Sequence, residues 1–192
     1  TSGSTTTDTG LSGQLSSLFN AFQAVATSPT LVSAQQALVS QAQTLASTFN
    51  QIDGQLDATR TSLNTSLTND VASANTLLSG IATLNQQIST AQFSGGTANS
   101  LLDEREQDLE NLSQLTNITT STGTNGAVNV SIGGQSLVSG NQVLDTLQTY
   151  DAGSGQLLVQ TATGGVNLTL TGGSMQGTID ARDGELATMQ SS

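Results

Sequence analysis

Very few side chains in this sequence could carry out chemistry. The chain contains no histidine, no cysteine and no lysine, and its charged residues are fourteen acids and three arginines. It therefore lacks the usual general base near neutral pH, a thiolate nucleophile and the common zinc ligands. Neither a Ser-His-Asp triad nor a Ser-Lys dyad can form without these residue types. We therefore predict that the protein is not an enzyme and has no catalytic residues.

Two short stretches place an arginine between acids, Asp103-Glu104-Arg105-Glu106 and Asp180-Ala181-Arg182-Asp183. Acid–base chemistry by paired carboxylates would require burial to raise the pKa of one of them, and nothing in these polar stretches predicts such burial. Local ion pairs and helix caps are the favoured interpretation. Two like-charged pairs lie four residues apart, which is typical of a solvated helix face (Glu104 with Asp108, Glu106 with Glu110). A calcium site would need an oxygen-rich loop containing glycine, so we predict no metal site.

Glycine pairs and glycosylation-like triplets are the remaining motifs. The Gly-Gly pairs are not followed by Lys-Ser/Thr and do not have GxGxxG spacing, so we interpret them as turns and predict no cofactor site. Asn-x-Ser/Thr triplets are what this composition produces by chance, and they occur at Asn64, Asn111, Asn117, Asn129 and Asn167.

The net charge of −11 excludes several classes of partner. A polyanion is repelled by a phosphate backbone and by an anionic membrane surface, so we predict neither nucleic-acid binding nor membrane binding. No apolar run approaches the roughly 18 residues of a membrane span, and no cleavable secretory signal opens the sequence. Only 9% of the residues are charged, so the surface is largely neutral and suited to packing against copies or relatives.

The element that should organise the chain is a very long helix from Ser28 to about Gln92. Ser28 is a good cap and Pro29, the only proline, fits the first helical position. Apolar residues then repeat every three, four or seven positions, which predicts the seam of a helical hairpin or coiled coil. The seam residues are Leu31, Leu38, Leu45, Phe49, Ile52, Leu56, Leu63, Leu67, Val71, Ala74, Leu78, Ile81, Leu84 and Ile88.

Shorter helices should flank this long one. Leu11, Leu15, Leu18, Phe19, Phe22 and Val25 predict a helix over about 11–26. Asn99 or Ser100 should cap another helix that runs to about Leu115. Met175, Ile179, Leu186 and Met189 predict the start of a last helix.

Between residues 118 and 171 the apolar period changes from 3.6 to 2. Val128, Val130 and Ile132 alternate with polar residues, and so do Leu168 and Leu170. Thr124-Asn125-Gly126, Gly133-Gly134, Asp151-Ala152-Gly153 and Gly164-Gly165 are turn signals. We predict four to six antiparallel strands.

The predicted fold class is α+β: an elongated bundle of long antiparallel helices with a small antiparallel β domain inserted. Residues 1–10 should be loose, 11–117 plus 173–192 should form a helical core domain, and 118–172 should form the β domain.

Several stretches resemble the bacterial flagellar hook-associated protein 1 family. The likeness covers most of the chain, beginning with Leu18-Phe19-Asn20-Ala21-Phe22-Gln23-Ala24 and Ser28-Pro29. The most specific stretch is Asn99-Ser100-Leu101-Leu102-Asp103-Glu104-Arg105-Glu106-Gln107. Gly173-Ser174-Met175-Gln176-Gly177 also resembles a family segment, although Gln176 replaces a glycine and Asp108 stands where an apolar residue is usual.

The resemblance implies a structural protein of the flagellum that joins the hook to the filament. Its implied partners are copies of itself in a ring, the hook protein, neighbouring junction and filament proteins, and an export chaperone. It implies an extracellular location reached through type III export without a cleaved signal. We expect the sequence to be a core fragment that lacks the terminal helices and the chaperone-binding segment, and to be monomeric in solution.

Two alternative functions remain open. One is a flagellin or another axial protein of the flagellum, and the Leu-Leu-Asp-x-Arg stretch favours the junction family over it. The other is a secreted adhesin or binding module with a coiled-coil stalk, whose β domain would bind a host ligand.

Overall fold

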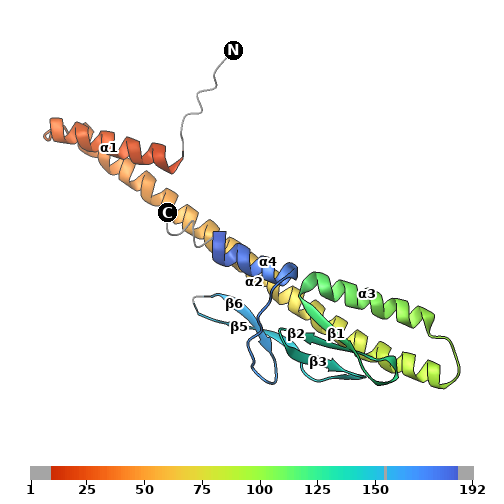
Figure 1. The fold of residues 1–192 in the computed structure, drawn as a ribbon. Helices are drawn as coiled ribbons and strands as arrows, with labels where there is room; N and C mark the ends of the chain where they lie inside the picture. The colour runs from red at the N-terminus through yellow and green to blue at the C-terminus, as the bar shows by residue number, and fades with distance from the viewer. Residues whose placement is uncertain (1–9, 154, 186–192) are drawn as a thin grey trace, which may run out of the picture. The chain divides into compact units, whose positions relative to one another are not determined.

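A computed structural model of the chain describes residues 10–153 and 155–185 (Figure 1). The described residues fall into two compact units, an N-terminal unit that ends at Thr59 and a C-terminal unit that begins at Arg60. The predicted loose stretch 1–10 lies outside the described residues except for Gly10, as do Leu186 and Met189 of the predicted last helix. The α+β fold class is confirmed by the helices and strands described below.

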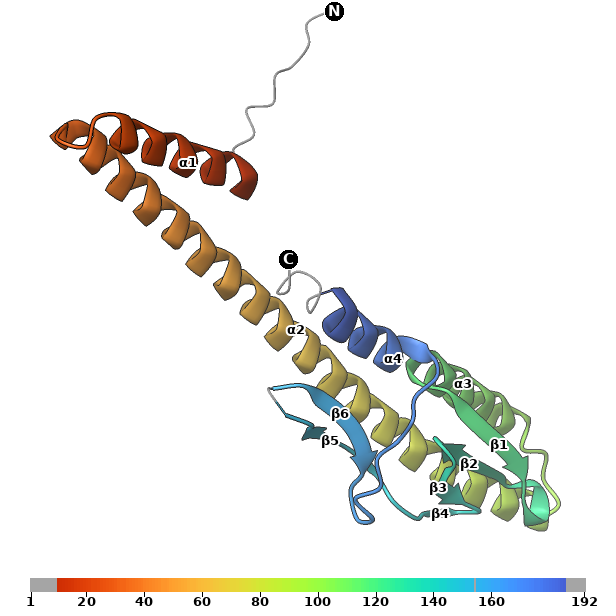
Figure 2. The same cartoon turned by 60° about the vertical axis from the view of Figure 1, so that its left-hand side comes forward.

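The N-terminal unit contains α1 (Leu11–Thr27) and the first part of α2 (Val32–Phe93). In Figure 2, α1 folds back along this part of α2. The predicted helix start at Ser28 and Pro29 is wrong, because these residues form the turn between the helices. The Ser28 N–H still donates to the Ala24 carbonyl at the end of α1 (3.0 Å), and the Ser28 carbonyl accepts from the Leu31 N–H (3.1 Å). Pro29 thus follows the first residue of a turn, where its fixed φ also suits it.

The predicted seam is confirmed in the second half of α2 and is partly wrong in the first half. Leu67, Val71, Ala74, Leu78, Ile81, Leu84 and Ile88 are buried. Leu31 and Phe49 are instead 53% and 48% exposed. The difference follows from the neighbours, because the second half of α2 is covered by the other elements of its unit.

Helix α3 (Asn99–Leu115) lies alongside the second half of α2 within the C-terminal unit (Figure 1). Neither Asn99 nor Ser100 caps it as predicted. Ala98 occupies the cap position without a side-chain hydrogen bond and is buried with Leu84 and Ile88. Packing of Ala98 therefore decides the helix start in place of a polar cap.

The strands form two antiparallel sheets. The first has the order β1-β2-β3-β4, from β1 (Ile118–Thr122), β2 (Val128–Ile132), β3 (Gln135–Ser139) and β4 (Gln142–Val143). The second pairs β5 (Leu147–Asp151) with β6 (Leu157–Thr161). The predicted turns at Asn125-Gly126 and Gly133-Gly134 are confirmed, and all four residues have positive φ.

Leu168 and Leu170 do not lie in a strand, so the strand predicted from their alternation with polar residues is wrong. This stretch makes only an isolated bridge between Asn167 and Gln160, and the Leu168 N–H donates to the Val159 carbonyl (3.0 Å). The chain then leaves toward α4, which spans Gly173–Asp180 and continues as one π-helical turn, Ala181–Glu185. Its Met175 is fully buried, which confirms the described part of the predicted last helix.

One hydrophobic core joins these elements of the C-terminal unit. Helix α3 contributes Leu109 and Leu112, α4 contributes Met175, and both sheets contribute residues. The α2 members are Leu67, Val71, Ala74, Leu78, Ile81 and Ala82. The sheets are therefore packed directly on the helices.

Candidate assembly surfaces and their supports

The long helix carries three asparagines that hold the β segments by side-chain hydrogen bonds. Asn64, Asn75 and Asn85 are spaced by about three helical turns, so they recur near one side of α2. The asparagine amide carries both a donor and an acceptor, so it can pair with a backbone peptide group. We refer to these three residues as the asparagine ladder.

Asn85 is the most buried member, with only 2% of its surface exposed. Its Nδ2 donates to the carbonyls of Val128 (2.8 Å) and Gly140 (2.6 Å), and its Oδ1 accepts from the Val128 N–H (3.0 Å). Oδ1 also accepts from Nη1 of Arg105 (2.8 Å). One side chain thereby ties α3, the start of β2 and the β3–β4 turn to α2.

Arg105 does not form the predicted local ion pair with its flanking acids. Its guanidinium turns inward, is 9% exposed, and donates to Asn85 and to the Gly126 carbonyl (3.0 Å). Burial lowers the pKa of Arg105, and the neighbouring carboxylate of Glu106 opposes this effect. Arg105 is therefore a structural residue that fixes the β1–β2 turn.

Asn75 and Asn64 make equivalent contacts further along the helix. Asn75 exchanges two hydrogen bonds with the backbone of Leu147, from Nδ2 to the carbonyl (2.9 Å) and from the Leu147 N–H to Oδ1 (2.8 Å). Asn64 donates to the Gly155 carbonyl (2.7 Å). These contacts fix the beginning of β5 and the β5–β6 connection.

Arg182 forms the predicted pair with Asp183 and also reaches the ladder. Its Nε lies 2.6 Å from Oδ1 of Asp183, while Nη1 donates to Oδ1 of Asn64 (2.9 Å) and to the Leu157 carbonyl. Arg182 is 3% exposed. The predicted local ion pair is therefore correct for Arg182, and the contacts to Asn64 and Leu157 are additional.

The acids of α3 remain spread along the helix. Asp103, Glu104, Glu106 and Glu110 are exposed, whereas Asp108 is half-buried. Burial, with a smaller contribution from Glu104, raises the pKa of Asp108. Its carboxylate lies against Gly80, where a Cβ atom would come within 2.7 Å of Oδ2. Across residues 10–153 and 155–185, no group of three or more acids is placed to hold a metal ion.

Exposed apolar side chains gather in the N-terminal unit. Phe19 and Val32 are 62% and 61% exposed, and the set comprises Leu11, Leu15, Phe19, Phe22, Leu31, Val32, Val39 and Phe49. We call these eight residues the apolar set. No charged residue lies between Asp8 and Asp53, the stretch that contains the whole apolar set. Exposed apolar side chains favour burial against another protein or against another part of the same protein. No helix among the described residues is long and apolar enough to span a membrane.

Sequence reasoning missed the asparagine ladder. A signal was present, since Asn64, Asn75 and Asn85 each adjoin a seam residue (Leu63, Ala74 and Leu84). A polar amide at the margin of a buried helix face requires a hydrogen-bond partner. The backbone groups that pair with these three asparagines lie 43 to 91 residues away in the sequence, so helical periodicity could not identify them.

The comparisons with known proteins agree with this architecture. A family model described as the flagellar hook-associated protein FlgK helical domain matches residues 4–192. The chain is 32% identical to flagellar hook-associated protein 1 of Bacillus subtilis over 113 residues, which are 59% of this chain and 22% of that protein. It is also 32% identical to the Salmonella typhimurium protein of the same name over 134 residues, 68% of this chain and 24% of that protein.

A solved structure extends the similarity to the fold. The flagellar hook junction protein FlgK from Burkholderia pseudomallei superimposes with a TM-score of 0.83 at 33% identity, covering 92% of this chain and 33% of that one. The chain spans only about a quarter of the length of the curated relatives that it matches. On the strength of the family match along nearly its entire length, the chain belongs to the flagellar hook-associated protein FlgK helical-domain family.

Proposed function

We propose that this chain is part of a structural protein of the bacterial flagellum that joins the hook to the filament. The observation that carries the proposal is the apolar set, which lies in a stretch without charged residues. Such side chains favour burial against neighbouring subunits. Phe19, Phe22 and Phe49 are about half exposed, so completing the burial of each contributes about 1 kcal/mol. The family match supplies the flagellar context.

The proposed partners are further copies in a ring, the hook protein, neighbouring junction and filament proteins, and an export chaperone. We also propose an extracellular location at the hook–filament junction, reached by type III export without a cleaved signal. We also propose that this 192-residue stretch carries no enzymatic activity, because it contains no histidine, cysteine or lysine. The 192-residue chain alone should be monomeric, which light scattering would test.

The predicted domain division is kept as part of this proposal. The helical core of 11–117 and 173–192 would contact other subunits, while 118–172 would face outward. The apolar set lies wholly in the first of these segments, which supports this assignment.

The proposal is tested in cells by adding charge to the apolar set. In a strain deleted for the gene that encodes this chain, hooks should be present while filament subunits appear in the medium. Complementation with Phe19→Asp and Phe22→Asp together should leave this defect, because two carboxylates would have to be desolvated at the contact. The matched control, Gln23→Asp, adds a charge at a neighbouring exposed polar position and should restore filaments.

The variant protein must be detected outside the cell, so that a failure of export is separated from a failure of assembly. Normal filaments in the deletion strain would contradict the junction function. Normal filaments with the double variant would contradict the role of the apolar set.

A further inference from the structure

Strand β1 presents an unpaired backbone edge. It is the first strand of the β1-β2-β3-β4 sheet, and β2 is its only strand neighbour in the described chain. In the β1–β2 turn the Gly123 N–H donates to the Ala127 carbonyl (2.7 Å). Hydrogen-bonded pairs alternate along an antiparallel ladder, so Ser121 with Asn129 and Thr119 with Ser131 are the next bonded pairs.

It follows that Ile118, Thr120 and Thr122 direct their N–H and C=O groups away from β2. Within residues 10–153 and 155–185, no protein group hydrogen-bonds to the outward N–H groups of Thr120 and Thr122. Natural edge strands are usually protected by charge, proline or a bulge. The edge sequence Ile-Thr-Thr-Ser-Thr carries no charge and no proline. An edge of this composition is suited to accept another strand.

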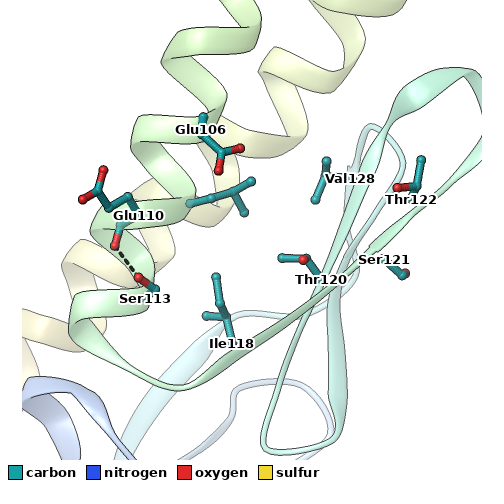
Figure 3. A pocket seen from close by; sticks show the side chains of 9 residues that line it. Glu106, Glu110, Ser113, Ile118, Thr120, Ser121, Thr122 and Val128 are labelled. Carbon is teal, nitrogen blue, oxygen red and sulfur yellow. Dashed lines mark hydrogen bonds between the residues drawn. The ribbon is translucent and has the colours of Figure 1, made fainter.

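A groove runs between this strand and helix α3. Its volume is about 570 Å³, and Leu109, Ile118 and Val128 supply its apolar lining. Figure 3 shows the Ile118 and Thr120 side chains directed toward α3 and the Ser121 side chain directed away. Because both Thr120 and Ser121 border the groove, it reaches the backbone edge of β1 as well as one face of the sheet. We call it the β1–α3 groove.

The charge in the groove identifies the side chain that it would receive. In Figure 3 the Glu106 carboxylate extends toward the strands, whereas the Glu110 carboxylate points away from them. An extended segment beside β1 would therefore place a lysine or arginine favourably opposite Glu106. The 192 residues of a second copy are poorly suited to supply one. The sequence has no lysine, Arg105 and Arg182 are buried, and Arg60 already interacts within the chain.

We propose that the β1–α3 groove binds an extended segment of a different protein, which adds as a strand to β1 and places a basic side chain against Glu106. Main-chain hydrogen bonds to Thr120 and Thr122 would provide affinity, and Glu106 would provide selectivity for a cation. The β1–α3 groove shares no residue with the apolar set and lies in the other unit of the chain, so strand binding there is independent of the proposed junction function.

Nuclear magnetic resonance titration of the 192-residue chain tests the proposal. The probe is a synthetic seven-residue peptide of alternating valine and threonine with a central lysine, and its matched peptide carries a central glutamate. The lysine peptide should shift the amide signals of β1 and α3 and protect the Thr120 and Thr122 N–H groups from solvent exchange. The glutamate peptide should bind about tenfold more weakly at 0.15 M salt, where charges beyond about 8 Å are screened.

Two variants separate the strand contact from the charge contact. Thr120→Pro removes an outward N–H without affecting the β1–β2 ladder, and should lower the affinity for the lysine peptide about tenfold. Glu106→Gln should lower the affinity for the lysine peptide by about threefold to fivefold, whereas the control Glu110→Gln should change this affinity less than twofold. Unchanged signals for β2 and β3 establish that each variant is folded.

The proposal is overturned if the lysine peptide at millimolar concentration causes no shifts in β1. It is also overturned if the two peptides bind equally, or if Glu106→Gln behaves like Glu110→Gln. Shifts confined to the apolar set would likewise contradict it, without affecting the proposed junction function.

Discussion

Replacing Asn85 by alanine should destabilise the C-terminal unit by about 3 kcal/mol. The substitution removes the partner of the Val128 N–H, the Val128 carbonyl and the Gly140 carbonyl, at about 1 kcal/mol for each lost hydrogen bond. It also removes a charge-assisted bond from Arg105, worth about 1.5–3 kcal/mol. The simple total of about 4.5–6 kcal/mol is an upper bound.

Water should recover part of this loss. A cavity of about 210 Å³ adjoins Asn85 and Gly140, so solvent can reach some of the groups that lose their partner. The remaining cost of about 3 kcal/mol is a large share of a typical domain stability of about 5–15 kcal/mol. The matched control is Asn141→Ala, because Asn141 makes one exposed hydrogen bond, to Oε1 of Gln86 (2.8 Å). That change should cost less than about 0.5 kcal/mol.

Urea denaturation followed by tyrosine fluorescence is a suitable assay. The chain has one tyrosine and no tryptophan, and Tyr150 lies in β5 of the C-terminal unit. A double-mutant cycle with Arg105→Met should give a coupling of about 1–2 kcal/mol between Asn85 and Arg105. The reasoning is refuted if Asn85→Ala costs no more than Asn141→Ala, or if the cycle shows no coupling.

Two further predictions concern the backbone and pH. Gly173 has φ +81°, and a Cβ there would lie 2.5 Å from the Leu115 backbone, so Gly173→Ala should destabilise by about 2–4 kcal/mol in the same urea assay. Gly177→Ala, in a helix with open space around it, should instead be neutral or stabilise by up to about 1 kcal/mol; equal effects would contradict this account. Hydrogen bonds from the Thr163, Gly164 and Thr146 N–H groups lower the pKa of Asp145 to about 2. Because the folded pKa is depressed, the stabilisation is present above about pH 4 and is lost as the pH falls through about 2. Between pH 4 and pH 2 the free energy of unfolding should therefore fall less for Asp145→Asn than for the unmodified chain. Urea denaturation at each pH measures this difference, and parallel pH profiles of the two free energies would contradict the effect.

The elements that the sequence predicted well are those set by local pattern. The seam from Leu67 to Ile88 is buried because it faces several other elements, and the Asn125-Gly126 and Gly133-Gly134 turns need positive φ values that asparagine and glycine tolerate. Helix α2 ends at Phe93 next to Gly95, whose φ is +74°, close to the predicted end at Gln92.

The misses arose where distant contacts decided the outcome. Arg105 donates hydrogen bonds to Asn85 and Gly126, twenty and twenty-one residues away, and not to the acids beside it in the sequence. Phe49 follows the seam period but is 48% exposed. The period identifies one face of a helix, but it does not say whether another element covers that face. Ser28 and Pro29 suit a helix start and a turn equally. The Ser28 N–H donates to the Ala24 carbonyl at the end of α1, and this hydrogen bond places both residues in the turn.

Immunogold labelling of purified hook–filament complexes tests the central claim most directly. Antibodies against the 192-residue chain would be applied to complexes from the organism that encodes it. The account predicts a single narrow band of gold at the boundary between hook and filament. Label along the whole filament, or no label on the flagellum, would contradict it.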